Sequence, residues 1–202
     1  MASPRRPSTG RRLPSPNRRR SVPVARPAPA SPGGLRIGLG FDAHPLAPGR
    51  RLMLGGVALT HDHGLAGHSD ADVLSHAICD ALLGALGLPD MGTRFPDSDP
   101  ALRGRSSLTF LREVAGEMRG LGYALVNLDA VVIAEAPRLQ PHVAQMRRTL
   151  AGALGCEPER IGIKAKRTEG LGTTGRREGI LAQAVALLQK TVVPRGRRAG
   201  PR

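Results

Sequence analysis

An amphipathic segment between residues 71 and 88 constrains the fold more than any other stretch of this chain. Its apolar residues recur at helical spacing: Val73, Leu74, Ala77, Ile78, Ala81, Leu82 and Ala85. Asp72, His76 and Asp80 recur at intervals of four residues, which places them on the opposite face of the predicted helix. Ser69 or Asp70 is a suitable N-cap. The segment therefore predicts a helix that packs one face against a core and presents a histidine on the other.

Strands and helices are predicted in mixed order along the rest of the chain. The predicted strands are 35–41, 51–54, 57–59, 123–134 and 160–166. The further predicted helices are 106–121 and 139–154, each followed by a glycine. Residues 180–189 are apolar, and their pattern does not distinguish a helix from a strand. This order predicts an α+β domain with a mixed β-sheet and helices packed on one face.

The formal net charge of +14 is concentrated at the two ends of the chain. Residues 1–34 contain eight Arg and no acid, and residues 191–202 contain four Arg and no acid, so residues 35–190 carry 14 − 12 = +2. The ends lack the apolar residues that would offset the entropy of ordering them, and we expect disordered basic tails around one folded domain. The nearly neutral domain has no Trp, one Tyr and three Phe, which argues against nucleic-acid binding.

The location of the protein is predicted from what the sequence contains. No apolar run approaches the roughly 20 residues that span a membrane, and the start has no secretory apolar core. The two cysteines make no disulfide framework, and Cys79 falls among apolar helix residues. We expect a protein of the bacterial cytoplasm that does not bind membranes. The Arg- and Ser-rich start leaves a plastid transit peptide as the alternative.

Three separated residues form a candidate metal site. Asp42 and His44 are two positions apart, a spacing that puts both side chains on one face of an extended segment, and His76 lies on the predicted helix. One carboxylate and two imidazoles suit a catalytic zinc, which takes three protein ligands and keeps one open position. Asp72 or Asp80, one turn from His76, could accept its second imidazole N–H. The alternative is a row of surface charges.

Two loops carry polar residues in number. Residues 89–105 form a long loop rich in Asp, Pro and Gly, whose acids are either functional or turn formers. Residues 168–176 form a Gly/Thr-rich turn between basic residues. Backbone N–H groups, hydroxyls and Arg together suit phosphate binding, although such a turn can also be an ordinary flexible loop.

Considered together, these motifs resemble the 2-C-methyl-D-erythritol 2,4-cyclodiphosphate synthase family. The matching segments are 36–44, 68–72 with His76, 90–92, 95–99, 134–138 and 175–176. The resemblance, over about 35–190, implies a lyase of non-mevalonate isoprenoid biosynthesis. Such an enzyme converts 4-diphosphocytidyl-2-C-methyl-D-erythritol 2-phosphate to 2-C-methyl-D-erythritol 2,4-cyclodiphosphate and releases CMP. The resemblance also implies a homotrimer with active sites between subunits. Another zinc-dependent phosphoesterase, using the same ligands, is the alternative.

The resemblance assigns roles to individual residues. It implies one zinc per subunit on Asp42, His44 and His76, and a Mg²⁺ or Mn²⁺ ion with the substrate diphosphate, held in part by Glu169. The implied catalytic residues are His68, Arg167 and Thr168. The implied substrate-binding residues are Asp42, His44, His68, Ser69, Asp90, Gly92, Phe95, Pro96, Asp97, Ser98, Asp99, Ala134, Ala136, Pro137, Arg138, Leu139, Thr168, Glu169 and Arg176. Two positions depart from the family pattern, since Arg167 stands where Thr is usual and Thr173 replaces a common Phe.

Overall fold

A five-stranded mixed sheet organises the computed structural model, which describes residues 34–191. The sheet order is β4-β1-β7-β5-β6, in which β5 and β6 are parallel and the other neighbours are antiparallel. Its strands are β1 Leu35–Pro48, β4 His63–Leu65, β5 Tyr123–Ile133, β6 Ile161–Lys166 and β7 Gly179–Lys190. The predicted mixed sheet is confirmed, and the ambiguous segment 180–189 is a strand. The predicted tails lie outside the described residues, apart from Gly34 and Thr191.

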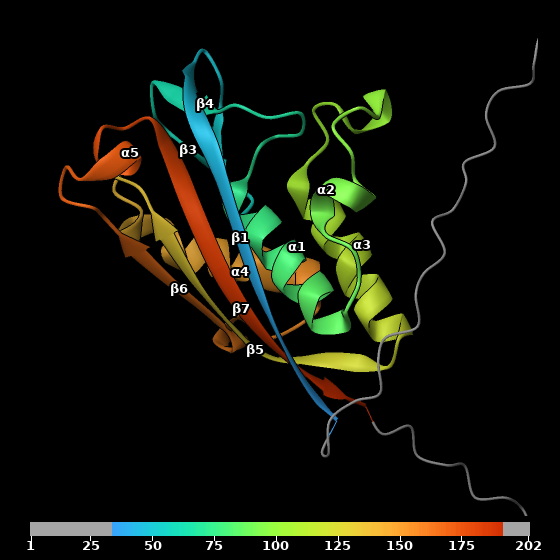
Figure 1. Cartoon of the computed structure of the whole chain (residues 1–202). Coiled ribbons are helices and arrows are strands. Elements are labelled where there is room, and N and C mark those ends of the chain that lie inside the picture. Colours follow the sequence, from blue (N-terminus) through green and yellow to red (C-terminus); the bar gives the residue numbers. More distant parts are fainter. Residues whose placement is uncertain (1–33, 192–202) are drawn as a thin grey trace, which may run out of the picture.

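Helices cover one face of this sheet (Figure 1). The helices are α1 Val73–Leu86, α2 Met91–Arg94, α3 Ser107–Gly120, α4 Val143–Leu154 and, in the connection between β6 and β7 at the end of the sheet, α5 Gly172–Gly175. There are 3₁₀ turns at Pro100–Leu102, Gln140–His142 and Pro158–Arg160. A separate hairpin pairs β2 Leu52–Leu54 with β3 Val57–Leu59 around Gly55-Gly56, as predicted. No helix among the described residues is long and apolar enough to cross a membrane.

The helix α1 packs against the backbone of β1 because two glycines permit it. A Cβ atom at Gly38 would lie 2.0 Å from the carbonyl oxygen of Ala81, and one at Gly40 would lie 2.0 Å from that of Ala77. No side chain fits at those distances, so the Gly-x-Gly pattern fixes how closely helix and strand approach. This contact sets the position of the polar residues that follow on β1. Cys79, on the same helix, is fully buried, as predicted.

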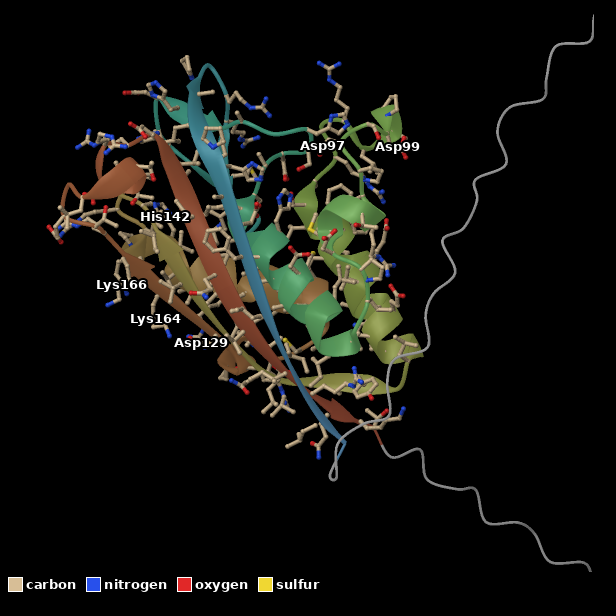
Figure 2. All side chains as sticks on the ribbon, in the orientation of Figure 1. Asp97, Asp99, Asp129, His142, Lys164 and Lys166 are labelled. Atoms are coloured by element: carbon tan, nitrogen blue, oxygen red, sulfur yellow. The ribbon has the colours of Figure 1, made fainter. Side chains whose placement is uncertain are left out.

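The opposite face of the sheet is apolar and exposed. On β1 the outward side chains of Ile37, Leu39 and Phe41 are 71%, 59% and 56% exposed, and Val185 on the neighbouring β7 is 37% exposed. Further along this face, on β5 and β6, Asp129 and Lys164 form an ion pair, and Lys166 also projects outward (Figure 2). The exposed side of the sheet thus combines an apolar half with a charged edge.

The start of α1 differs from the prediction. Its N-cap is Asp72, whose side chain accepts from the backbone N–H of Ser75 at 3.1 Å, rather than Ser69 or Asp70. The preceding Ala71 has φ 56°, a left-handed conformation that costs an alanine about 1–2 kcal/mol. Because of this turn the helix begins later, and Ser69 and Asp70 are free to contact other elements.

Candidate active site

Asp42, His44 and His76 converge, and together they form a possible metal site. Asp42 Oδ2 lies 3.0 Å from His44 Nε2 and 3.0 Å from His76 Nδ1, and the two histidine nitrogens are 3.1 Å apart. A tetrahedral zinc with bonds of about 2.0–2.1 Å separates its ligand atoms by about 3.3 Å. The triad therefore fits a small tetrahedral cation after an adjustment of a few tenths of an ångström. The side chains are 12–26% exposed, so the site is accessible from one side.

The surroundings of the triad shift the pKa values of Asp42 and His44. Burial raises the pKa of Asp42, but hydrogen bonds and charge from His44 and His76 outweigh it, and the net pKa lies far below the ordinary range. Burial lowers the pKa of His44, but the hydrogen bond and charge of Asp42 outweigh it and hold that pKa above its ordinary value. Asp42 is therefore ionised at neutral pH, as a metal ligand must be.

The second nitrogen of His76 does not contact either predicted partner. Asp72 is fully buried and accepts hydrogen bonds from the backbone of Gly55 and Gly56, at 2.9 and 2.6 Å, so it fixes the hairpin. Asp80 accepts from the backbone N–H of Met91 at 2.8 Å. The prediction that one of them orients His76 is wrong, because helix capping and loop anchoring use both carboxylates.

Ser107 is the partner that the sequence analysis missed. His76 Nε2 lies 2.8 Å from Ser107 Oγ and 3.2 Å from Ser69 Oγ. Ser107 in turn contacts the carboxylate of Asp70. In the sequence, serines and aspartates at these places read as helix caps, and no local signal reveals that α3 approaches α1 here.

Three residues predicted to bind substrate, His68, Asp90 and Asp99, lie on loops that hydrogen bonds hold in place. His68 Nε2 is 3.0 Å from the carbonyl oxygen of Asp99, which joins the loop before α1 to the loop after α2. The Asp90 side chain caps α2 through Thr93 N at 2.7 Å. Asp99 caps the following 3₁₀ turn, and Figure 2 shows it with Asp97 on this loop. Asp90 and Asp99 therefore form turns, which does not exclude substrate contacts.

Among the other predicted residues of the loop 90–99, Phe95 makes an aromatic contact close to the triad. Phe95 packs on Phe110, with ring centroids 4.6 Å apart, and the ring centroid of His76 lies 6.5 Å from that of Phe110. Gly92 lies within α2, and Pro96 and Ser98 continue the loop beyond Phe95. The aromatic pair connects the loop to α3 and so to the element that carries Ser107.

A second predicted cluster lines a pocket at the other edge of the sheet. This pocket has a volume of about 250 Å³. It is lined by Ala134, Glu135, Pro137, Arg138, Leu139, Gln140, Ala165, Lys166 and Arg167. Ala136 precedes a cis peptide bond to Pro137 and lies on the same turn. Most of the substrate-binding residues predicted between 134 and 139 thus line one hollow of the structure.

Glu135 holds the Gly/Thr-rich turn, a role that the sequence analysis did not assign. Its Oε1 accepts from Thr168 N at 2.8 Å and Thr168 Oγ1 at 3.0 Å, and from Gly170 N at 3.4 Å. These bonds, with the charge of Arg167, lower the pKa of Glu135 against the opposing effect of burial. Thr168 Oγ1 also lies 3.1 Å from Thr174 Oγ1. The turn is therefore folded and not an open flexible loop.

The charged residues of this turn lie in solvent. Arg167 and Glu169 form an ion pair at 3.3 Å, with side chains 58% and 75% exposed. Arg176 pairs with Glu178 at 2.7 Å. The structure does not bring Glu169 together with another predicted metal ligand within the described residues.

The two parts of the predicted site are separated within one chain. The triad begins on β1, and the pocket lies at the ends of β5 and β6, with β7 between. Neighbouring strands are about 4.8 Å apart, so β1 and β6 differ by roughly 14 Å across the sheet. A single subunit thus presents the triad (the metal half) and the pocket (the proposed nucleotide half) at different places.

Comparison with known proteins identifies the family. The family model described as the YgbB family matches residues 35–189. This chain belongs to the YgbB family. The 2-C-methyl-D-erythritol 2,4-cyclodiphosphate synthase of Syntrophomonas wolfei is 53% identical over 156 residues, which cover 77% of this chain and 99% of that protein. The synthase of Synechococcus elongatus (strain PCC 7942) is 58% identical over 153 residues, 76% of this chain and 96% of that protein.

A solved structure agrees with this assignment to the YgbB family. The CDP complex of IspF from Plasmodium falciparum aligns with a TM-score of 0.71 and 32% identity, over 80% of this chain and 100% of that chain. The family resemblance predicted from the sequence motifs is confirmed.

Proposed function

We propose that this chain is a 2-C-methyl-D-erythritol 2,4-cyclodiphosphate synthase. It converts 4-diphosphocytidyl-2-C-methyl-D-erythritol 2-phosphate to the 2,4-cyclodiphosphate and CMP. The observation that carries the proposal is the triad of Asp42, His44 and His76, already assembled at metal-binding distances in a chain of this family. The relatives that bear this enzyme name are matched over nearly their whole length.

Zinc is the metal that we assign to the triad. One carboxylate and two imidazoles leave a fourth position open, which is the arrangement of catalytic zinc. When bound, the cation polarises the phosphoryl group that is attacked. A second divalent cation, Mg²⁺ or Mn²⁺, with Glu169 as a protein ligand, would neutralise the diphosphate. These assignments extend the observed triad by the chemistry of its donor set.

The chain's own residues orient the substrate and need not activate its nucleophile. A phosphate monoester with a second pKa of about 6 is largely ionised at neutral pH, so its attack requires no strong base. Correct orientation alone can supply on the order of 7–11 kcal/mol. We assign this orientation to His68 and Ser69 near the triad and to the folded turn at Thr168. Arg138 and Arg176, with Lys166 and Arg167 at the nucleotide pocket, supply positive charge.

We assign the cytidine group to the pocket between 134–140 and 165–167. Its volume of about 250 Å³ and its backbone-rich turn suit a flat base. The loop 90–99 is assigned to the methylerythritol hydroxyls and phosphate. At the position where the family usually has Thr, Arg167 would supply positive charge in place of a hydroxyl.

We also propose a homotrimer in which neighbouring subunits complete each active site. The apolar sheet face with Ile37, Leu39 and Phe41 is a suitable interface, because exposed apolar surface of this extent marks an association site. The separation of the metal half from the nucleotide half supports a shared site. Location in the bacterial cytoplasm stays a prediction.

The test is product analysis on the purified protein. With substrate, zinc and magnesium we expect CMP and one cyclic diphosphate in equal amounts, measured by chromatography and phosphorus NMR. Linear phosphate products would instead support a zinc-dependent phosphoesterase. Absence of CMP release from a zinc-loaded protein would refute the proposed cyclisation.

A further inference from the structure

The nitrogen of His76 that faces away from the triad contacts a buried hydroxyl pair. Ser107 Oγ lies at 2.8 Å and Ser69 Oγ at 3.2 Å from Nε2. Ser107 is fully buried at the first turn of α3, and Ser69 is 8% exposed. Because the pair is shielded from solvent, the partners of this nitrogen are set by the protein.

The single proton of the Ser107 hydroxyl is used elsewhere. Both the backbone N–H and the hydroxyl of Ser107 donate to Asp70 Oδ1, the former at 3.0 Å. Once its proton points to that carboxylate, Ser107 Oγ has only lone pairs for His76. Nε2 then satisfies its 2.8 Å contact with Ser107 by carrying the ring proton and donating it. The neutral ring keeps its lone pair at Nδ1, the atom that would face a metal shared with Asp42, whose Oδ2 lies 3.0 Å away.

We propose that Ser107, oriented by Asp70, is a positioning residue that fixes the tautomer and ring orientation of His76 for metal binding. The inference rests on the zinc site proposed above. Metal-bound histidines usually donate their second N–H to a carboxylate or a carbonyl. In this chain the hydroxyl of Ser107 lies between the His76 ring and the Asp70 carboxylate, so Asp70 acts on the ring through Ser107. Loss of that hydroxyl leaves Nε2–H with the longer contact to Ser69.

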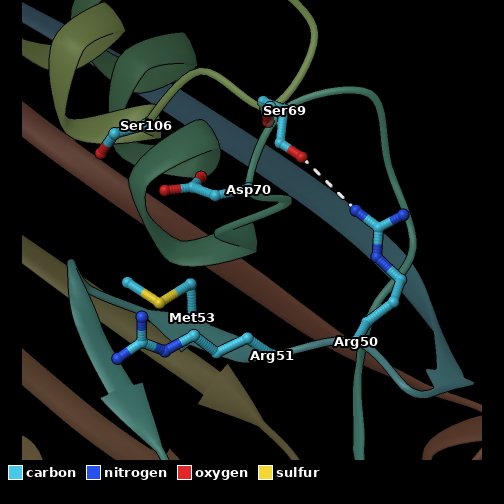
Figure 3. Close-up of a pocket in the computed structure, with 7 residues that line it drawn as sticks. Arg50, Arg51, Met53, Ser69, Asp70 and Ser106 are labelled. Carbon is cyan, nitrogen blue, oxygen red and sulfur yellow. Dashed lines mark hydrogen bonds between the residues drawn. The ribbon is translucent and has the colours of Figure 1, made fainter.

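The position of Asp70 is itself fixed by its surroundings. Its backbone N–H donates to the carbonyl of Arg105 at 3.1 Å. On the other side lies a pocket of about 500 Å³, where the Arg50 guanidinium donates to the carbonyl of Gly67 at 3.1 Å and approaches that of Ser69 at 3.5 Å (Figure 3). These contacts hold the segment before α1 against α3. The contact from Asp70 to Ser107 is thus part of a rigid arrangement.

Zinc affinity measured by competition with a chromophoric chelator tests the proposal. Ser107→Ala is expected to weaken zinc binding about 10- to 100-fold, the usual effect of removing an outer partner of a ligand histidine. Ser107→Thr, which keeps the hydroxyl, is expected to bind zinc nearly as tightly as the unaltered protein. Ser106→Ala is the matched control, since Ser106 caps α3 without a side-chain hydrogen bond, and it should leave zinc affinity unchanged.

A spectroscopic measurement on the unaltered zinc-loaded protein does not depend on how well a variant folds. With ¹⁵N-labelled histidine we expect a slowly exchanging proton on Nε2 of His76, and faster exchange in Ser107→Ala. A rapidly exchanging Nε2 proton in the unaltered zinc-loaded protein, or zinc affinity in Ser107→Ala equal to that of the unaltered protein, would overturn the inference. If the unaltered protein binds no zinc at all, the proposed metal site fails instead, so the two failures are distinguishable.

Discussion

Asp42, His44 and His76 lie within a framework of strand and helix, whereas the turn from Arg167 to Arg176 connects an edge strand to β7 and holds its charges in solvent. The triad is partly buried, and its atoms already have the spacing of a metal site. The turn is folded by Glu135 and Thr168, yet its charged side chains form exposed ion pairs, Arg167 with Glu169 and Arg176 with the following Glu178. The comparison teaches that the possible metal site is assembled within one subunit, while the charged groups of the turn remain exposed, as expected if they serve the proposed ligand or neighbouring subunit.

The largest expected effect is on the metal half. In Asp42→Asn the charged ligand is lost and the two imidazoles keep no anionic partner, so zinc affinity should fall by more than the about 100-fold that an outer partner is worth. Turnover should fall with it, while the folded assembly remains. Metal analysis and CMP release on the same sample check this. An active, zinc-loaded Asp42→Asn protein would contradict the role of the triad.

Disrupting the exposed sheet face separates the two halves. Ile37→Asp places a charge in the apolar face and should yield monomers with little turnover, because the proposed site needs a neighbouring subunit. Zinc affinity should persist, since all three ligands come from one chain. Analytical ultracentrifugation and zinc titration measure both properties. Arg112→Asp, on the exposed side of α3, is the control that should stay assembled.

Loosening the turn should affect turnover and leave the metal alone. Glu135→Ala removes the acceptor of two close hydrogen bonds from Thr168, and misplacement by about 1 Å can cost up to about 100-fold in rate. Glu135→Gln keeps an acceptor of the same shape and should lose less. Steady-state CMP release together with zinc content distinguishes this from damage to the triad. Reduced zinc content in Glu135→Ala would show that the halves are coupled.

Acid should weaken zinc binding moderately. Because the pKa of His44 is raised, protons begin to compete with the metal at a pH above the ordinary histidine pKa. As the pH falls, zinc affinity should decrease by up to about tenfold per pH unit. In the metal-free protein the ionised Asp42 carboxylate, whose pKa is depressed, stabilises the folded state above about pH 4. This contribution to the free energy of unfolding is lost as the pH falls further. The protonated His44 ring, whose pKa is raised, stabilises the folded state below about pH 6.5. This contribution is lost as the pH rises through the pKa of His44 in the folded protein. Calorimetry at several pH values should show both trends.

The smallest effect is expected at Arg167. Its ion pair with Glu169 is largely exposed, and such pairs contribute little to stability. Arg167→Thr restores the usual family residue, so activity should be retained. Kinetic constants with the natural substrate check this. Complete loss of turnover would show that this chain positions phosphate differently from its relatives.

Sequence periodicity predicted the main elements, because strands and helices with one buried face have distinct periods of apolar residues. The short predicted strands 51–54 and 57–59 correspond to the hairpin of β2 and β3. The convergence of Asp42, His44 and His76 was inferred from the ligand chemistry of zinc. The structure brings these three side chains together. The partner of His76 was not predictable from the sequence. Asp72 could either cap α1 or contact His76, and the approach of Ser107 depends on how α3 packs.

Co-assembly of two inactive variants tests most directly whether each site combines halves from two subunits. Asp42→Asn lacks a working triad, and Thr168→Ala lacks a hydroxyl of the turn. In mixed trimers, confirmed by native mass spectrometry, about one quarter of the sites should pair an intact triad with an intact turn, so CMP release should rise well above that of either variant alone. Mixed trimers with no more activity than the separate variants would contradict a shared site.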